Sequence, residues 1–79
     1  MLRWVFSRGG HTLTCELDAR ARHTFDVSLI PHWDVSGSVV ERFGDAVRAM
    51  ERHAAIVRAL RHAGWALVEH VAPGHARAA

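Results

Sequence analysis

The sequence has one cysteine and no lysine. Cys15 is the only cysteine among 79 residues, so an internal disulfide is impossible and we expect a cytoplasmic protein. All ten basic residues are arginine, which raises the sequence pI to about 10.0 although the formal net charge is only +2. Because an arginine-only, alanine-rich chain is typical of a GC-rich genome, the high pI alone does not indicate nucleic-acid binding.

Long apolar runs and catalytic motifs are also missing. No stretch approaches the roughly 18 apolar residues of a membrane-spanning helix, and the apolar N-terminal stretch is too short for a secretory signal. The sequence has no glycine-rich phosphate loop, no nucleophile elbow and no paired-carboxylate pattern. We therefore predict a protein that is not an enzyme, takes no cofactor and does not contact a membrane.

The composition is that of one small globular domain. Apolar residues make up 49% of the chain and charged residues 23%, both ordinary values. We predict a single α+β domain over residues 1–71 and a flexible C-terminal tail over residues 72–79.

The clearest local pattern is a β-hairpin that joins residues 2–7 to residues 12–17 through the segment RGGH. Two adjacent glycines suit a two-residue turn whose central residues have positive φ, and such a turn pairs Arg8 with His11. This register separates apolar from polar side chains almost completely, as a correct register should. The predicted apolar face consists of Leu2, Trp4, Phe6, Leu13, Cys15 and Leu17.

Further segments complete the predicted fold. Residues 18–23 form a polar connection, residues 24–30 alternate as a strand, and residues 39–43 predict a fourth strand. A helix should begin after Asp45 and end near Gly64, with the segment WALVEHV adding an edge strand. The fold class is therefore α+β: an antiparallel sheet of four or five strands with one long helix packed across one face. The buried arc of the helix should consist of Ala46, Val47, Ala49, Met50, Ala54, Ile56, Val57 and Leu60.

Two titratable residues have structural interpretations. Cys15 lies beneath Trp4 on the apolar face, which predicts a packed, unreactive thiol. His53 falls within the apolar arc of the helix, which predicts a half-buried ring bonded to a backbone carbonyl or packed on an aromatic; a functional role would need Glu41 opposite it. A metal site around the third strand is an alternative, built from His23, Asp26, His32 and Asp34.

Arginines on the exposed helix arc support a nucleic-acid alternative. Arg48, Arg52 and Arg58 share this arc, although Glu51 interrupts it. Trp33, in the loop after the third strand, is the aromatic residue that we expect to be accessible. Together these four residues predict, as an alternative function, a weak single-stranded nucleic-acid-binding surface.

The leading hypothesis is a non-enzymatic interaction module. A small sheet that is covered on one face leaves edges open, and association would bury more surface. Val5 and Ile30 on the outer face, together with Trp33, are the expected contact residues. The expected partner is a second copy of the chain, as a homodimer, or another protein.

Residues 39–70 resemble the second half of a WGR domain, which has a strand ending in phenylalanine, a helix, a glycine-aromatic pair and a closing strand. The matching positions are Phe43, Ala46, Leu60, Gly64 and Trp65. The resemblance implies this strand–helix–strand order and a nucleic-acid role, but HWDVSGS stands where that family has its Trp-Gly-Arg signature. The chain is also similar to small bacterial proteins in which four strands precede one long helix, and that resemblance implies no activity.

Overall fold

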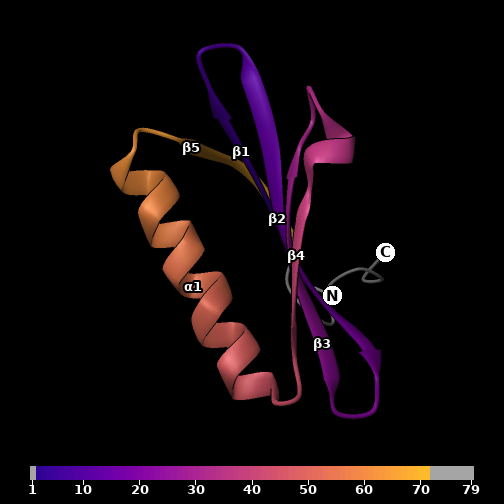
Figure 1. Ribbon diagram of the computed structural model, residues 1–79. Coiled ribbons are helices and arrows are strands. Elements are labelled where there is room, and N and C mark those ends of the chain that lie inside the picture. Colours follow the sequence, from indigo (N-terminus) through magenta and orange to yellow (C-terminus); the bar gives the residue numbers. More distant parts are fainter. Residues whose placement is uncertain (1, 72–79) are drawn as a thin grey trace, which may run out of the picture.

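The computed structural model describes residues 2–71, which form one sheet and one long helix (Figure 1). The sheet has five antiparallel strands in the order β4-β3-β2-β1-β5, and α1 packs against one face. The predicted α+β class is confirmed, and the predicted tail lies outside the described residues. The elements are β1 (Leu2–Arg8), β2 (His11–Ala21), β3 (Thr24–Pro31), a 3-10 turn η1 (Val35–Gly37), β4 (Val39–Phe43), α1 (Ala46–His62) and β5 (Ala66–Val71).

The β1–β2 hairpin has the predicted register throughout, from Arg8 opposite His11 to Leu2 opposite Leu17. The turn works because Gly9 and Gly10 take φ values of 55° and 83°, which side chains disfavour. The prediction that residues 18–23 are only a connection was wrong. β2 continues to Ala21 and pairs with β3, because polar side chains there do not prevent the backbone from forming ladder hydrogen bonds.

The hydrophobic core lies between α1 and the sheet face that carries Phe6 and Cys15, both of which are fully buried. The helix contributes Ala49, His53 and Val57 to the buried side, at a spacing of one helical turn. Asp45 caps its N-terminus by accepting a hydrogen bond from the Val47 N–H at 2.9 Å.

The C-terminus of α1 is closed by a glycine and a tryptophan. Gly64 adopts a φ of 93°, and the Trp65 N–H donates to the Leu60 carbonyl at 3.0 Å. Leu60 and Trp65 both pack, partly buried, against the core cluster. The predicted terminator therefore also fixes the position of an indole ring.

The predicted buried arc of the helix was too wide. Ala46, Val47, Met50 and Ala54 are exposed, and the exposed fractions of Val47 and Met50 are 62% and 57%. A helix that crosses a sheet touches it along one narrow stripe, so the flank of the apolar arc stays in solvent.

The outer face of the sheet is more buried than its polar sequence predicts. Val5 and Thr14 lie opposite each other and are only 6% and 2% exposed. The His32 ring, which follows β3, is hydrogen-bonded through Nε2 to the Thr14 Oγ1 at 2.7 Å. Val5 is therefore a buried residue, contrary to its predicted role as an exposed contact, and Ile30 is half-buried.

Candidate binding surfaces

Several large apolar side chains of the described residues are exposed. Seven hydrophobic residues form the buried core, and seven large hydrophobic residues are more than half exposed. A domain of this size buries only about 60% of its unfolded surface, so association would add substantially to it. The exposed residues are Trp33, Val35, Val39, Val40, Val47, Met50 and Val68.

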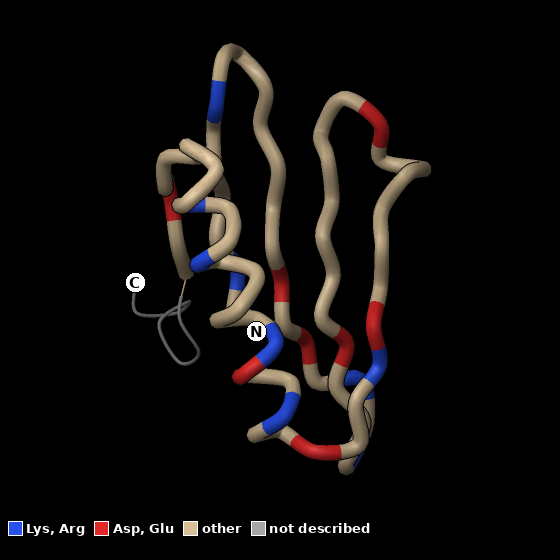
Figure 2. The backbone as a smooth tube through the Cα atoms, turned by 60° about the vertical axis from the view of Figure 1, so that its left-hand side comes forward, with Lys and Arg blue, Asp and Glu red and all other residues tan. Residues whose placement is uncertain are grey.

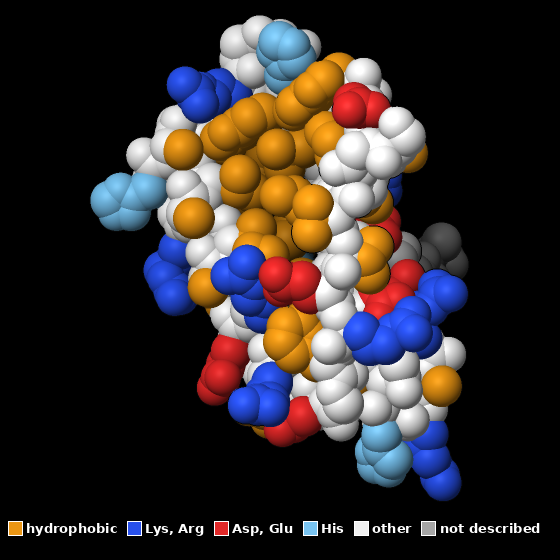
Figure 3. Space-filling view, in the orientation of Figure 1, with side chains coloured by type: hydrophobic (Ala, Val, Ile, Leu, Met, Phe, Trp, Pro, Cys, Tyr) orange, Lys and Arg blue, Asp and Glu red, His pale blue; other side chains and the backbone are white. Residues whose placement is uncertain are grey.

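Hydrophobic side chains gather between α1 and the β3–β4 side of the sheet (Figure 3). Leu29 of β3 and Ile56 of α1 pack partly buried against the core, and Leu29 is paired with the exposed Val39 of β4. An ion pair also bridges α1 and β4. Arg52 of α1 donates to Glu41 of β4 through Nε at 2.7 Å and Nη2 at 3.3 Å. The Arg52 side chain, 46% of which is exposed, therefore has a carboxylate partner within the chain.

The two edges of the sheet differ in regularity. β4 pairs with β3 without interruption from Phe43 to Val39, and within residues 2–71 it has a neighbour on that side alone. The pairing of β5 with β1 shifts between Val5 and Phe6, which leaves Val68 as an extra residue in β5. Bulges of this kind discourage edge-to-edge pairing. Among the described residues, β4 is therefore the more regular of the two open edges.

The charged residues of β4 are bonded above and below the sheet. Arg42 donates two hydrogen bonds to Asp26 on the outer face, at 2.8 and 3.1 Å, and Arg20 adds a contact at 3.5 Å. The hydrogen bond from Arg42 and the two positive charges hold the pKa of the Asp26 carboxyl below its ordinary 3.8. Glu41 is held by Arg52 on the opposite face. Both charges of the edge strand thus have partners within the chain.

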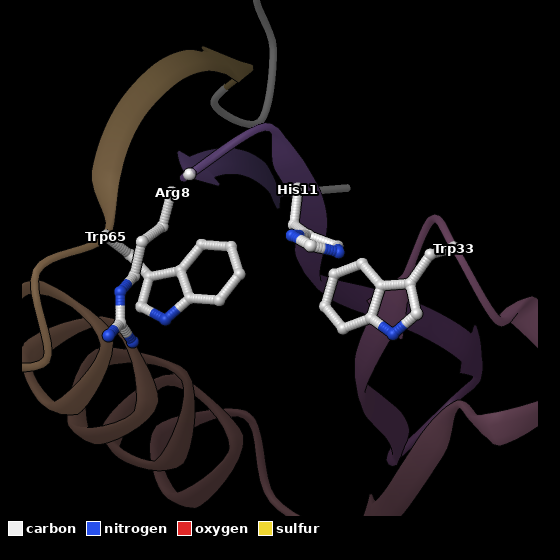
Figure 4. Close-up of a pocket in the computed structure, with 5 residues that line it drawn as sticks. Arg8, His11, Trp33 and Trp65 are labelled. Atoms are coloured by element: carbon white, nitrogen blue, oxygen red, sulfur yellow. The ribbon is translucent and has the colours of Figure 1, made fainter.

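A second surface lies where the hairpin turn, the loop after β3 and the end of α1 meet (Figure 4). Arg8, Gly9, His11, Trp33 and Trp65 line a hollow of about 380 Å³. The planes of Trp33 and Trp65 are within 12° of parallel, with ring centroids 6.2 Å apart. His11 meets Trp33 edge-on at a centroid distance of 4.9 Å.

The structure divides the predicted arginine surface. Arg48 lies in the first turn of α1, about 15 Å along the axis from Arg58. Arg58 lines a hollow with Arg61 and His62 near the C-terminal end of α1. Arg52 is paired with Glu41. Of the three predicted arginines, Arg58 is therefore the one on the C-terminal half of the helix.

Sequence reasoning missed the roles of Arg8, His11 and Trp65 at the hollow. These residues belong to a turn and to a helix terminator, and the sequence supports a purely structural interpretation of both. Their proximity to Trp33 is a tertiary relationship, since Trp33 and Trp65 are 32 positions apart. Trp33 itself is accessible as predicted, with 54% of its surface exposed.

The buried titratable residues make the predicted contacts, although His53, which is only 3% exposed, is more buried than the half-buried ring that was predicted. The His53 Nε2–H donates to the Cys15 carbonyl at 3.2 Å, and its ring meets Trp4 edge-on at 5.8 Å. Burial lowers the pKa of His53, and Glu41 is bonded to Arg52 rather than facing it. Burial also raises the pKa of the Cys15 thiol to about 12, so the thiol stays protonated and is a poor nucleophile.

The predicted metal alternative has no support among residues 2–71, which contain no cluster of three or more histidine, cysteine or acidic side chains able to hold an ion. In the same part of the chain, no helix is both long and apolar enough to cross a membrane. Comparisons with protein-family models, curated proteins and solved structures found no match.

Proposed function

We propose that the chain is a non-enzymatic interaction module that forms a homodimer through the β4 edge. The observation that carries this proposal is the regular, open β4 edge, on which Val39 and Val40 project to opposite faces and are each 56% exposed. An open edge presents unpaired backbone N–H and C=O groups that a second strand can satisfy. Antiparallel pairing of two β4 strands is isologous and closes after two copies.

A two-fold axis at Val40 gives the favoured register. Val40 then lies opposite the partner's Val40 on the outer face, and Val39 lies opposite the partner's Glu41 on the helix face. An axis at Glu41 would instead place two carboxylates directly opposite each other, which is destabilising. The axis at Val40 thus forms an apolar contact at the centre of the interface and keeps like charges apart.

Two copies of this edge can approach each other with little repulsion between like charges. The charged residues of β4 are satisfied within their own chain, so the edge offers a partner its backbone and its valines. Covering the exposed half of a valine contributes about 1 kcal/mol, and each backbone hydrogen bond contributes a similar amount. After the cost of association, we expect a reversible dimer with a Kd on the order of micromolar.

Disulfide trapping tests the proposed interface. A Val40→Cys variant places two thiols opposite each other across the axis, at a Cα separation of about 5 Å that a disulfide can span. Mild oxidation should therefore convert it to a covalent dimer. The matched control is Val68→Cys on the bulged edge, where the side chain is equally exposed at 58%. Cys15 is buried and does not interfere.

Equal trapping of the two variants would contradict the β4 interface. The yield of covalent dimer should also be measured as the protein is diluted. If the yields from Val40→Cys and Val68→Cys fall equally fast, random collision explains both, and the β4 interface is contradicted.

A further inference from the structure

Two indole rings form an aromatic shelf at the end of the molecule that carries the hairpin turn. Figure 4 shows Trp33 and Trp65 side by side with their ring faces turned the same way, consistent with the 12° between their planes. Trp33 is more than half exposed, although it is one of the most apolar side chains of the protein. An exposed aromatic surface offers a flat ligand a face on which to stack.

Backbone contacts hold both indoles in place before any ligand arrives. Trp65 follows the helix terminator and packs on the core cluster. Trp33 sits in a turn that is fixed by two hydrogen bonds, from the His32 N–H to the Thr12 carbonyl at 2.9 Å and from the Asp34 N–H to the Pro31 carbonyl at 3.1 Å. Because the shelf is preformed, binding a flat ring on it costs little ordering of the protein.

One arginine, Arg8, borders the shelf and forms no salt bridge within residues 2–71. The side chain of Arg8 extends beside Trp65 in Figure 4, and its Nε lies against Gly64, 3.9 Å from where a Cβ would stand. The salt bridges in this part of the chain use Arg3, Arg20, Arg42 and Arg52, and none uses Arg8, Arg58 or Arg61.

Acidic groups are scarce at this end. None lines either hollow, and Asp34, which neighbours Trp33, accepts a hydrogen bond from the Ser36 hydroxyl at 2.9 Å. Most acidic positions lie in the half of the molecule away from the hairpin tip (Figure 2). The shelf is therefore suited to a ligand that combines a flat aromatic group with negative charge.

We propose that the hollow at Trp33 and Trp65 binds nucleotides, with a base stacked on the indoles and a phosphate at Arg8. Its volume of about 380 Å³ falls in the range of small-ligand sites. Arg58, Arg61 and His62 line a separate hollow near the C-terminal end of α1, whose charge would suit further phosphates of a longer ligand. The occupant that we propose is therefore a single strand, whose unstacked bases are free to stack on the indoles. This site differs from the predicted helix surface, because Arg8, His11 and Trp65 take the places of Arg48 and Arg52.

The site does not depend on the proposed homodimer. The residues that line the hollow belong to β1, β2, the loop after β3 and the end of α1, whereas the dimer edge is β4. A variant that abolishes pairing through β4, Val40→Lys, should bind nucleotides as the natural sequence does.

Fluorescence anisotropy with a labelled oligothymidine at low salt provides the test, with thymidine monophosphate, a duplex and an acidic peptide of similar charge as competitors. We expect the oligothymidine to bind, the duplex and the peptide to compete weakly, and added salt to weaken binding. Trp33→Ala should weaken binding on the order of tenfold, because stacking of a base on an aromatic ring contributes substantially to the free energy of binding. Arg8→Gln should weaken binding several-fold. It should also reduce the slope of log K against log salt concentration by about one, the value for one lost phosphate contact.

Arg48→Gln is the matched control, because it removes the same charge at the far end of α1 and should leave affinity within about twofold. Circular dichroism spectra of each variant show whether the fold is retained. Competition by the monophosphate comparable to that by the strand would support the nucleotide site and identify a free nucleotide as its ligand. Absence of binding at low salt, unchanged affinity of Trp33→Ala, or stronger competition by the duplex or the peptide would overturn the proposal.

Discussion

Arg52 of α1 and Glu41 of β4 form a bidentate ion pair, with Nε–Oε1 at 2.7 Å and Nη2–Oε2 at 3.3 Å. This pair joins the helix to the edge strand and gives Arg52 a carboxylate partner that would compete with a phosphate. The same pair keeps the carboxylate of Glu41 on the helix face of β4, where it does not obstruct the approach of a second strand.

The ion pair predicts a small effect on stability. Both side chains are well exposed, at 46% and 39%, so Arg52→Gln should lower the free energy of unfolding by no more than about 1 kcal/mol. Urea unfolding followed by circular dichroism measures this loss, with Arg48→Gln as the control for removal of a helix arginine. Oligothymidine binding by Arg52→Gln should equal that of the natural sequence. Weaker binding would show that Arg52 contacts phosphate despite its partner.

His53 predicts a pH dependence of stability in the mildly acidic range. Burial holds the pKa of the folded imidazole below 6.5, so the unfolded chain takes up a proton first as the pH falls. Stability is therefore complete above about pH 6.5 and declines below it, by at most about 1.4 kcal/mol per pH unit. The contribution of Asp26, whose pKa Arg42 holds below 3.8, is lost only at lower pH.

Urea unfolding at several pH values between about 5 and 7 isolates the histidine effect. His53→Gln should flatten the dependence, whereas His62→Gln, on the exposed side of the same helix, should leave it unchanged. An equal slope in the natural sequence and in His53→Gln would assign the effect to another group.

Cys15 predicts an unreactive thiol. It is fully buried, and burial raises its pKa to about 12, so a thiol reagent such as Ellman's should label it only after unfolding. Cys15→Ser should destabilise the fold by about 1–3 kcal/mol, because it places a hydroxyl in an apolar site. Stoichiometric labelling of the native protein within seconds would contradict this burial.

A substitution at Val5 distinguishes a residue of the core from an exposed contact residue. It is 6% exposed, so Val5→Ala should lower the free energy of unfolding by about 1–3 kcal/mol. An exposed contact residue would instead leave the stability of the monomer unchanged and weaken association. Comparing urea unfolding with the dimer Kd for this variant decides between the two roles.

Local sequence rules predicted the parts of the fold that depend on neighbouring residues. Gly9 and Gly10 determined the hairpin register, because positive φ at both positions allows only a tight turn. Asp45 and Gly64 bounded the helix through its capping hydrogen bond and its left-handed end.

The features that sequence reasoning missed are all tertiary. A helical wheel cannot say which line of the helix touches the sheet, so Val47 and Met50 were wrongly assigned to the buried side. The partner of Arg52 depends on how the helix crosses β4. The contact between Trp33 and Trp65 needs the loop after β3 and the end of α1 to meet at the hairpin tip. These contacts decide which arginines and aromatics share a surface.

Sedimentation equilibrium of the natural sequence beside Val40→Lys tests the β4 homodimer most directly, with Val68→Lys as the matched control at the other edge. If the dimer forms through β4, the natural sequence and Val68→Lys associate reversibly to dimers with a Kd on the order of micromolar, and Val40→Lys stays monomeric. A strict monomer for the natural sequence well above that concentration, or equal dimerisation of Val40→Lys, would contradict the β4 homodimer.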